Sequence, residues 1–246
     1  MLITWPRRSS KRWMRWRSLE MKVGIHQPQY LPWLPYLLKI TECDLFVLLD
    51  SVDFQKNGLQ NRNQVKTPQG ACWLTVPVRH KLGQSIVDVQ IDASSNWQRK
   101  HWQTFAINYR KAAAFALYSE ELEAAYQTEW KSLVDINLHF LEIIMEGLGI
   151  NTPLRRSSEM TATGKGSELI LNLCGEVNAS TYLSGIGAQN YLDEKAFEEA
   201  GIHIEYRRPV FPDPYPQQYP GAGFLNDLSA IDLLLNCGCH WDRYVP

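Results

Sequence analysis

Residues 22–50, KVGIHQPQYLPWLPYLLKITECDLFVLLD, contain the strongest indications of the fold class. This stretch begins in a short apolar strand, Met21 to Ile25. It ends in DLFVLLDSV, Asp44 to Val52, which is apolar before Asp50, as expected of a strand covered on both faces. Between them, apolar residues at helical spacing predict a helix from about Leu34. This order of strand, loop, helix and strand predicts a parallel pair with a right-handed crossover.

The remainder of the chain repeats this plan. Residues 152–176 and 180–209 each have the pattern of a strand, a glycine-containing loop and a helix, whereas residues 95–150 are amphipathic and helical. SIVDVQID, residues 85–92, alternates as a half-buried strand. We predict an α/β fold, Rossmann-like, with a mainly parallel sheet and a helical subdomain at about 95–150, folded as one domain over 21–246.

Two ionisable side chains are expected at one edge of this sheet. His26 follows the first strand and Asp50 the second, and ligands of parallel sheets collect outside the carboxyl ends of the strands. We predict catalytic roles for both, since imidazole can act as a general base or a donor near neutral pH and the carboxylate can orient a base or a ribose hydroxyl. Prolines stiffen the loop after the first strand, where we predict substrate contacts from Gln27, Gln29 and Tyr30. The alternative is a rigid structural loop.

The segment FQKNGLQNRNQVKTPQGACWLTVPV, residues 54–78, is dense in amides and cations and closes with an apolar strand. Such side chains donate hydrogen bonds to phosphate or carboxylate oxygens. We therefore expect an anionic ligand to contact Lys56, Asn61, Arg62 and Asn63. The alternative is a solvated hairpin in which the Asn-Gly pair at 57–58 turns the chain.

Two glycine-containing loops supply further expected contacts. TGKGS, residues 163–167, precedes an apolar helix, so Lys165 and the amides of the helix start can attract an anion. A plain helix cap with flexible glycines is the alternative. SGIG, residues 184–187, follows a predicted strand, and glycines allow the backbone to approach a ligand closely. We predict substrate contacts there from Ser184, Gly185 and Gly187.

The composition is that of a globular protein, with 45% apolar and 21% charged residues. No stretch approaches the roughly 18 consecutive apolar residues of a membrane helix, so no membrane span is expected. The net charge of −1 hides an asymmetry: residues 1–20 carry six basic side chains against Glu20, and the remainder has 19 Lys+Arg against 25 Asp+Glu, or −6. We expect the leader, residues 1–20, to be a disordered or spurious extension, with translation starting at Met21. The alternative is an arm for nucleic acid or anionic lipid.

Cysteine usage indicates a reducing environment. The five cysteines are odd in number and scattered without paired metal spacing, at Cys43, Cys72, Cys174, Cys237 and Cys239. That pattern is typical of reduced thiols, so we expect a cytoplasmic protein without a metal site. The sequence leaves cofactors and oligomeric state open.

Several motifs stand in a fixed order: GIHQPQYLPWLPYLLKI, FVLLDSVDFQKNGLQNRNQVKTPQG with WLTVPV, NWQRKHW with NYRKA, TYLSGIGAQNYLD with FEEAGI, and LSAIDLLLNCG. In this order they resemble the WbqC-like family, bacterial proteins associated with gene clusters for surface polysaccharide and O-antigen biosynthesis. The resemblance covers Met21 to about Gly238. It implies a transferase, with glycine transfer to a polysaccharide suggested for some members.

The loop after the first strand is also similar, more distantly, to nucleotidyltransferases of the HIGH-motif class, in which histidines at this place stabilise a reacting phosphate. Here His26 has no second histidine beside it, because Gln27, Gln29 and Tyr30 fill the loop. This departure weakens the case for adenylyl transfer.

We therefore predict a transferase of surface polysaccharide (O-antigen) biosynthesis. It would move an aminoacyl group, such as glycyl, or a similar small group to a sugar or nucleotide-sugar, so the expected partner is a small-molecule sugar or nucleotide-linked substrate. The alternatives are a HIGH-like nucleotidyltransferase, which needs ATP or CTP with magnesium, and a non-catalytic nucleotide-sugar binding protein. The acidic body argues against a nucleic-acid partner.

Overall fold

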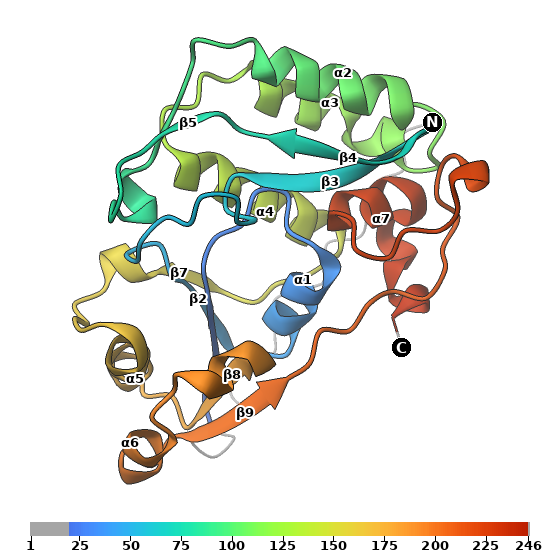
Figure 1. Ribbon diagram of the computed structural model, residues 1–246. Coiled ribbons are helices and arrows are strands. Elements are labelled where there is room, and N and C mark those ends of the chain that lie inside the picture. Colours follow the sequence, from blue (N-terminus) through green and yellow to red (C-terminus); the bar gives the residue numbers. More distant parts are fainter. Residues whose placement is uncertain (1–19, 246) are drawn as a thin grey trace, which may run out of the picture.

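The computed structural model describes residues 20–245, and its centre is a five-stranded parallel sheet (Figure 1). Taken across the sheet, the strands are β7 (Leu154–Arg156), β2 (Leu45–Leu48), β1 (Lys22–His26), β8 (Thr181–Gly185) and β9 (His203–Arg207). Counted along the chain, this order is 3-2-1-4-5, as in doubly wound nucleotide-binding sheets. The predicted α/β class with a mainly parallel sheet is confirmed. The basic leader lies outside the described residues except for Glu20.

Helices cover both faces of the sheet. α1 (Leu34–Thr41) packs on one face, and α5 (Gly166–Glu176) and α6 (Glu194–Glu199) pack on the other. Alternation along the strands divides the core accordingly: Val23 and Ile25 of β1 contact the α5 side, while Gly24 and His26 point to the α1 side. The strand order reverses between β1 and β8, so a crevice is expected at the carboxyl ends of these two strands.

A long insertion separates β2 from β7. It contains an antiparallel hairpin, β3 (Arg62–Thr67) and β4 (Gly70–Thr75), and the short pair β5 (Val78–Arg79) and β6 (Gln90–Ile91). Three helices follow, α2 (Trp97–Asn108), α3 (Phe115–Gln127) and α4 (Leu133–Gly147), which confirm that the middle of the chain is helical. The last helix, α7 (Ala230–Cys237), packs against α3, α4 and β3. The limits predicted for a separate subdomain stay a prediction.

Two local expectations about the insertion need correction. Asn57 does turn the chain, with φ of 69°, but the hairpin closes at residues 68–69, where Thr67 pairs with Gly70. Residues 85–92 are not one strand, because residues 86–88 form a 3-10 turn and only Gln90–Ile91 pair. Alternation alone could not distinguish this turn from a strand, since Val89 and Ile91 are buried and Asp88 and Gln90 are exposed, as a half-buried strand would have them.

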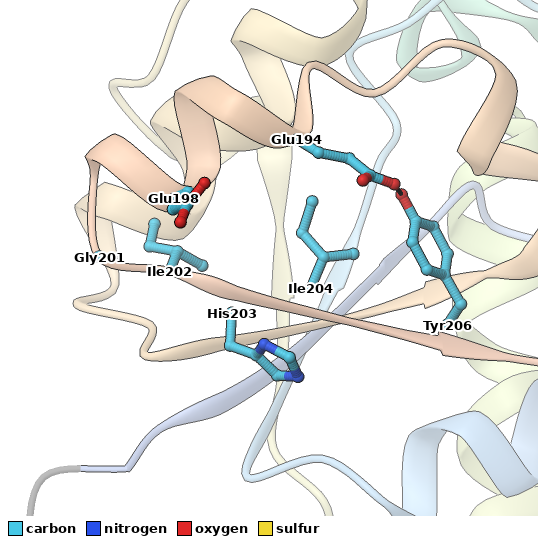
Figure 2. Close-up of a pocket in the computed structure, with 7 residues that line it drawn as sticks. All are labelled: Glu194, Glu198, Gly201, Ile202, His203, Ile204 and Tyr206. Carbon is cyan, nitrogen blue, oxygen red and sulfur yellow. Dashed lines mark hydrogen bonds between the residues drawn. The ribbon is translucent and has the colours of Figure 1, made fainter.

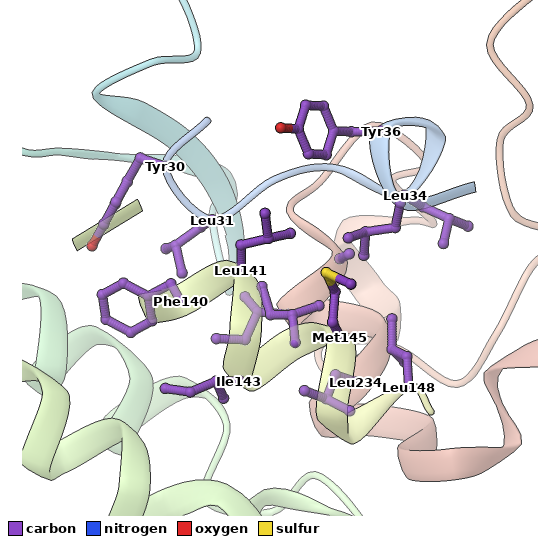
Figure 3. Packing of buried hydrophobic residues seen from close by; sticks show 14 of the residues in the cluster. Tyr30, Leu31, Leu34, Tyr36, Phe140, Leu141, Ile143, Met145, Leu148 and Leu234 are labelled. Carbon is purple, nitrogen blue, oxygen red and sulfur yellow. The ribbon is translucent and has the colours of Figure 1, made fainter. Parts of the chain in front are cut away.

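The proline-containing loop after β1 is anchored by apolar packing. Tyr30 and Leu31 lie against Phe140 and its neighbours on α4, and Leu34 continues the same cluster toward α7 (Figure 3). α1 itself begins with a proline in its first turn, where the missing N–H does no harm, and residues 34–40 are all buried. This packing fixes the loop that carries the residues beyond β1.

Gly24 occupies a position where no side chain fits. A Cβ built there would lie 2.6 Å from Cys43 Sγ and 2.8 Å from the Phe46 ring. We expect Gly24→Ala to lower the free energy of unfolding by about 1–3 kcal/mol, because the core must shift to accept the methyl group. Urea denaturation measures this. The matched control is Gly175→Ala in α5, where a Cβ meets nothing within 4 Å and a slight gain in stability is expected; equal effects of the two variants would contradict the prediction.

Candidate functional site

The carboxyl ends of the parallel strands carry two hollows, one on each side of the end of β1. The first, named the narrow lobe, has a volume of about 200 Å³. It is lined by residues from the loop after β1, from α1, and from the ends of β8 and β9: His26, Trp33, Pro35, Tyr36, Lys39, Gly185, Ile186, Gly187, Arg207, Arg208 and Pro209. It lies at the point where the strand order reverses, the usual ligand position of such sheets.

The second hollow, named the wide lobe, has a volume of about 570 Å³. It is lined by residues that follow β1 and β2 and by the start of α5: Gln27, Leu49, Ser51, Val52, Asp53, Gln55, Ser85, Gly164, Lys165, Gly166, Leu169, Ile170 and Tyr191. Because His26 and Gln27 are consecutive yet line different lobes, the two hollows flank a single strand end.

His26 presents one free ring nitrogen to the narrow lobe. Its Nδ1 lies 3.1 Å from the carbonyl oxygen of Gln27, which can only accept, so Nδ1 carries the proton and Nε2 keeps its lone pair. The ring packs edge-on against Tyr36 at 5.2 Å between centroids. Burial, with the nearby charge of Lys39, lowers the pKa of His26 to about 4. The imidazole is therefore neutral near pH 7 and can accept a hydrogen bond through Nε2.

Lys39 is a buried cation that the sequence analysis did not identify. Its side chain is 5% exposed, and Nζ donates to the carbonyl oxygen of Ile25 at 2.8 Å. Within residues 20–245 no carboxylate pairs with this ammonium, and burial lowers its pKa to about 8. The amine lies beside the carbonyl group of Ile25, the residue before His26, so its positive charge is close enough to lower the pKa of the imidazole.

Tyr36 places a second unpaired polar group at the narrow lobe. The residue is 3% exposed, and its hydroxyl has no hydrogen-bond partner in the described part of the chain. Burial raises the pKa of this hydroxyl above its usual range. In Figure 3 the Tyr36 ring lies on one side of the ribbon that connects Leu31 with Leu34, and Leu141 and Met145 lie on the other side. A buried hydroxyl without a partner is costly unless a ligand or water satisfies it.

Two arginines at the end of β9 complete the narrow lobe. Arg207 is paired with Glu42, and its Nε donates to a carboxylate oxygen at 2.6 Å. Arg208 is exposed, and no carboxylate pairs with it among residues 20–245. The lobe therefore has an excess of positive charge from Lys39 and Arg208.

Polar side chains line much of the wide lobe, and its one cationic side chain is Lys165. Lys165 and the two flanking glycines lie at the start of α5, whose first turn receives no hydrogen bond from a capping side chain. Gln27 lines the same lobe, with its Oε1 accepting from Gln60 Nε2 at 2.8 Å. The structure thus brings together Gln27 with Lys165, and His26 with Gly185 and Gly187, as separate groups.

Asp50 lines neither lobe, although Leu49 and Ser51 on either side of it line the wide lobe. It is fully buried, and its two carboxylate oxygens accept from Arg156 Nε at 2.8 Å, from Ser157 Oγ at 3.0 Å, and from the amide and hydroxyl of Ser158, both at 2.8 Å. All four donors belong to the segment that ends β7 and follows it. This geometry joins β2 to β7 and leaves no oxygen of Asp50 facing a ligand, so we assign it a structural position.

Three of the predicted substrate contacts are engaged in internal hydrogen bonds. Tyr30 bonds through its hydroxyl to His101 Nδ1 at 2.9 Å and to Tyr126 at 2.7 Å. Asn61 Nδ2 donates to Val76 O at 2.8 Å, and Asn63 Nδ2 donates to Leu31 O at 2.7 Å. These contacts connect the β1 loop to the hairpin and the helices, as the structural alternative for this loop describes.

The other four predicted contacts also lie outside the two lobes. Arg62 donates to Asn57 O at 2.6 Å and stacks over the Trp73 ring at 4.5 Å. Lys56 is exposed, and Ser184 is buried with its hydroxyl 3.4 Å from Gly185 O. Gln29 is buried and its Oε1 has no partner among the described residues. The amide and cation cluster of residues 54–66 therefore does not converge with His26.

A further hollow lies between α6 and the edge strand β9, and Figure 2 shows its lining. Glu194 accepts a hydrogen bond from Tyr206 at 2.7 Å across it, and Ile202 and Ile204 face α6. The opening is a surface groove lined by Glu194 and Glu198, and it lies on the outer edge of the sheet. We do not include it in the candidate site.

Within residues 20–245, no group of three or more His, Cys, Asp or Glu side chains is placed to hold a metal ion. Over the same residues, none of the helices has the length and apolar character needed to cross a membrane.

Comparison with known proteins identifies the family. A model of the WbqC-like protein family matches residues 27–244. The uncharacterized protein Rv1507c of Mycobacterium tuberculosis is 34% identical over 227 residues, which cover 91% of this chain and 97% of that protein. No solved structure matches significantly. The chain therefore belongs to the WbqC-like protein family.

Proposed function

We propose that the chain is a cytoplasmic transferase of surface polysaccharide (O-antigen) biosynthesis, which moves an aminoacyl group, such as glycyl, or a similar small group to a sugar or nucleotide-sugar. The observation that carries this proposal is the neutral imidazole of His26 at the reversal point of the sheet, with Nε2 free and a hollow on each side of its strand end. A transfer reaction needs two substrates next to one proton acceptor, and this arrangement supplies that.

The volumes of the two lobes support the binding of a different substrate in each. A volume of about 200 Å³ suits a small donor group, whereas about 570 Å³ accommodates most of a sugar or nucleotide-sugar. The donor would be an activated aminoacyl ester or thioester: His26 Nε2 would accept the proton of the attacking hydroxyl or amine as the new acyl bond forms, and the alcohol or thiol of the donor would leave. Lys165 at the start of α5 would hold an acidic group of the larger substrate, because helix starts and ammonium groups favour anions.

A second candidate function is nucleotidyl transfer. The strand order 3-2-1-4-5 is that of doubly wound nucleotide-binding sheets, and His26 follows the first strand at the place where a phosphate would be contacted. This function requires a nucleoside triphosphate with magnesium and releases pyrophosphate, whereas transfer from an activated aminoacyl ester or thioester releases an alcohol or a thiol. The two are therefore separated by their products.

A thermal-shift screen of the full chain against nucleotide-sugars, nucleoside triphosphates and amino acids tests the proposal first. A ligand at about 100 times its dissociation constant stabilises the fold by about 2.7 kcal/mol. Amino acids that bind are then supplied as their thioesters together with the sugar hits, mass spectrometry follows the sugar product, and a coupled assay follows pyrophosphate. We expect a sugar that gains the mass of an aminoacyl group. Pyrophosphate release would favour the second candidate, and binding without any product would indicate a binding protein.

A variant that fills part of the narrow lobe tests whether product formation depends on that lobe. Gly187 lines the narrow lobe, and a Cβ there meets nothing within 4 Å, so Gly187→Val places two methyl groups into the lobe without disturbing the core. We expect this variant to lose product formation. The control is Gly175→Val, an exposed position outside both lobes with equally open space, which should retain it.

A further inference from the structure

The narrow lobe contains a charge that the protein does not balance. Lys39 is almost completely buried, its only hydrogen-bond acceptor is the carbonyl oxygen of Ile25, and no carboxylate of residues 20–245 pairs with it. The titratable groups facing it are the thiols of Cys43 and Cys174 and the guanidinium of Arg207. Burial raises the pKa of each thiol to about 12, so neither supplies a negative charge near pH 7. A buried cation without an anion is unfavourable, so the lobe favours a ligand that brings negative charge.

A hydrogen-bond donor without an acceptor stands beside this charge. The Tyr36 hydroxyl is buried and unpartnered in the described chain, and the residue lines the same lobe. Because a phenol can donate one hydrogen bond and Lys39 Nζ retains two unused protons, an oxygen-rich group can satisfy both residues at once. Lys39 and Tyr36 lie three residues apart on α1, which places them on the same side of that helix.

The remaining walls fit a small anion. Glu42 already balances Arg207, but Arg208 adds a second unpaired positive charge at the mouth. Gly185 and Gly187 leave the opposite wall open, since a Cβ at either position meets nothing within 4 Å. A volume of about 200 Å³ holds a phosphate or carboxylate with a few attached atoms, and excludes a whole nucleotide-sugar.

We propose that the narrow lobe is a binding site for a small oxyanion, the phosphate or carboxylate group of one substrate, held by Lys39 Nζ, the Tyr36 hydroxyl and Arg208. The two uncompensated cations favour the dianionic phosphate over the carboxylate. This inference deepens the proposed function, since it names the chemistry of the substrate part beside His26, and it rests on that proposal only for the role of the bound group in transfer.

Binding of the oxyanion also acts on His26. The charge of Lys39 contributes to the low pKa of the imidazole, after burial. An anion paired with Lys39 cancels that contribution, so the pKa of His26 rises from about 4 when the site is filled. The substrate would thus strengthen the base that acts on it.

The test uses the full chain with inorganic phosphate and, separately, acetate, and measures affinity by titration calorimetry. Lys39→Met removes the charge but keeps the length of the side chain, Tyr36→Phe removes only the hydroxyl, and Lys111→Met, an exposed position that lines neither lobe, is the control. A charge-assisted hydrogen bond of the usual strength corresponds to about 10-fold to 100-fold weaker phosphate binding in Lys39→Met. Tyr36→Phe should weaken binding by about 3-fold to 10-fold, and Lys111→Met should bind as the wild type does.

Two further readouts keep the outcome clear. Without ligand, Lys39→Met should be as stable as the wild type or more stable, because an unpaired buried charge is removed. In the wild type, phosphate should raise the pKa of His26 in an NMR titration, and it should not do so in Lys39→Met, which binds more weakly and lacks the charge that the anion would cancel. Tighter binding of acetate than of phosphate would assign the site to carboxylates.

No measurable binding of either anion, or equal binding by Lys39→Met and the wild type, would overturn the oxyanion site. These results are independent of turnover. If the protein binds phosphate through Lys39 but forms no product, the oxyanion site stands and the proposed function is wrong. If it forms product but its phosphate binding does not depend on Lys39, the proposed function stands and the oxyanion site is wrong.

Discussion

His26→Ala is expected to reduce turnover of the substrate pair by about 100-fold, the usual contribution of a positioned general base. The variant removes Nε2, the free ring nitrogen at the narrow lobe, while the partly exposed ring contributes little to the core. Steady-state kinetics measures the loss, and circular dichroism with thermal melting checks the fold. His203→Ala is the matched control, because His203 is exposed at the start of β9 and lies outside both lobes.

A second substitution at residue 26 distinguishes a role of the imidazole as a base from a role in holding the loop in place. His26→Asn retains a donor that can reach the carbonyl oxygen of Gln27, the partner of Nδ1, but has no counterpart of Nε2. If the imidazole acts as a base, His26→Asn should be as slow as His26→Ala in kcat with a KM near the wild-type value. Added imidazole should restore part of the rate of His26→Ala. Turnover that stays within a factor of about two in both variants would remove His26 from the mechanism, since a working base contributes far more.

Asp50→Ala is expected to lower the free energy of unfolding by about 3–5 kcal/mol, because it removes the buried acceptor of the Arg156 guanidinium and of three donors from Ser157 and Ser158. Asp50 has no exposed surface, and Arg156, Ser157 and Ser158 all donate to its carboxylate. Urea denaturation at neutral pH measures the loss. Asp88→Ala removes an exposed carboxylate and should change the stability by less than about 0.5 kcal/mol.

The Asp50 result also decides between two roles for this carboxylate. A protein that unfolds more easily but keeps its turnover while folded supports the structural position. If instead Asp50→Asn retains full stability and loses turnover, the carboxylate belongs to the reaction, and the internal hydrogen bonds described above are not its main purpose.

The first half of the sheet could be predicted because its signals are local. The stretch from Lys22 to Asp50 contains the strand, the proline-stiffened loop, the buried helix and the second strand in continuous order, and β1 and β2 pair as expected. The position of His26 at a strand end followed from the same order. That is why His26 and Gln27 could be identified without coordinates, while the two glycine-containing loops indicated Lys165, Gly185 and Gly187.

The partners of the other polar residues could not be predicted, because they come from distant parts of the chain. Asp50 is satisfied by residues 106 to 108 positions later, and Asn63 by a residue 32 positions earlier. A dense polar segment therefore resembled a ligand-binding loop when its amides in fact bond to buried backbone. Lys39 was missed for the opposite reason, since a lysine within LPYLLKI reads as a solvent-facing residue of an amphipathic helix, and only the packing of every residue from 34 to 40 reveals that it is buried.

The arrangement at the end of β1 restricts how this segment can evolve. Successive side chains of an extended chain point in opposite directions, and for this reason His26 and Gln27 reach different lobes. Deletion of a single residue between Lys22 and His26 would move Gln27 to the narrow lobe beside Lys39, and insertion of one would move His26 to the wide lobe beside the start of α5. Functional homologues should accordingly tolerate substitutions in this segment far more readily than any change in its length.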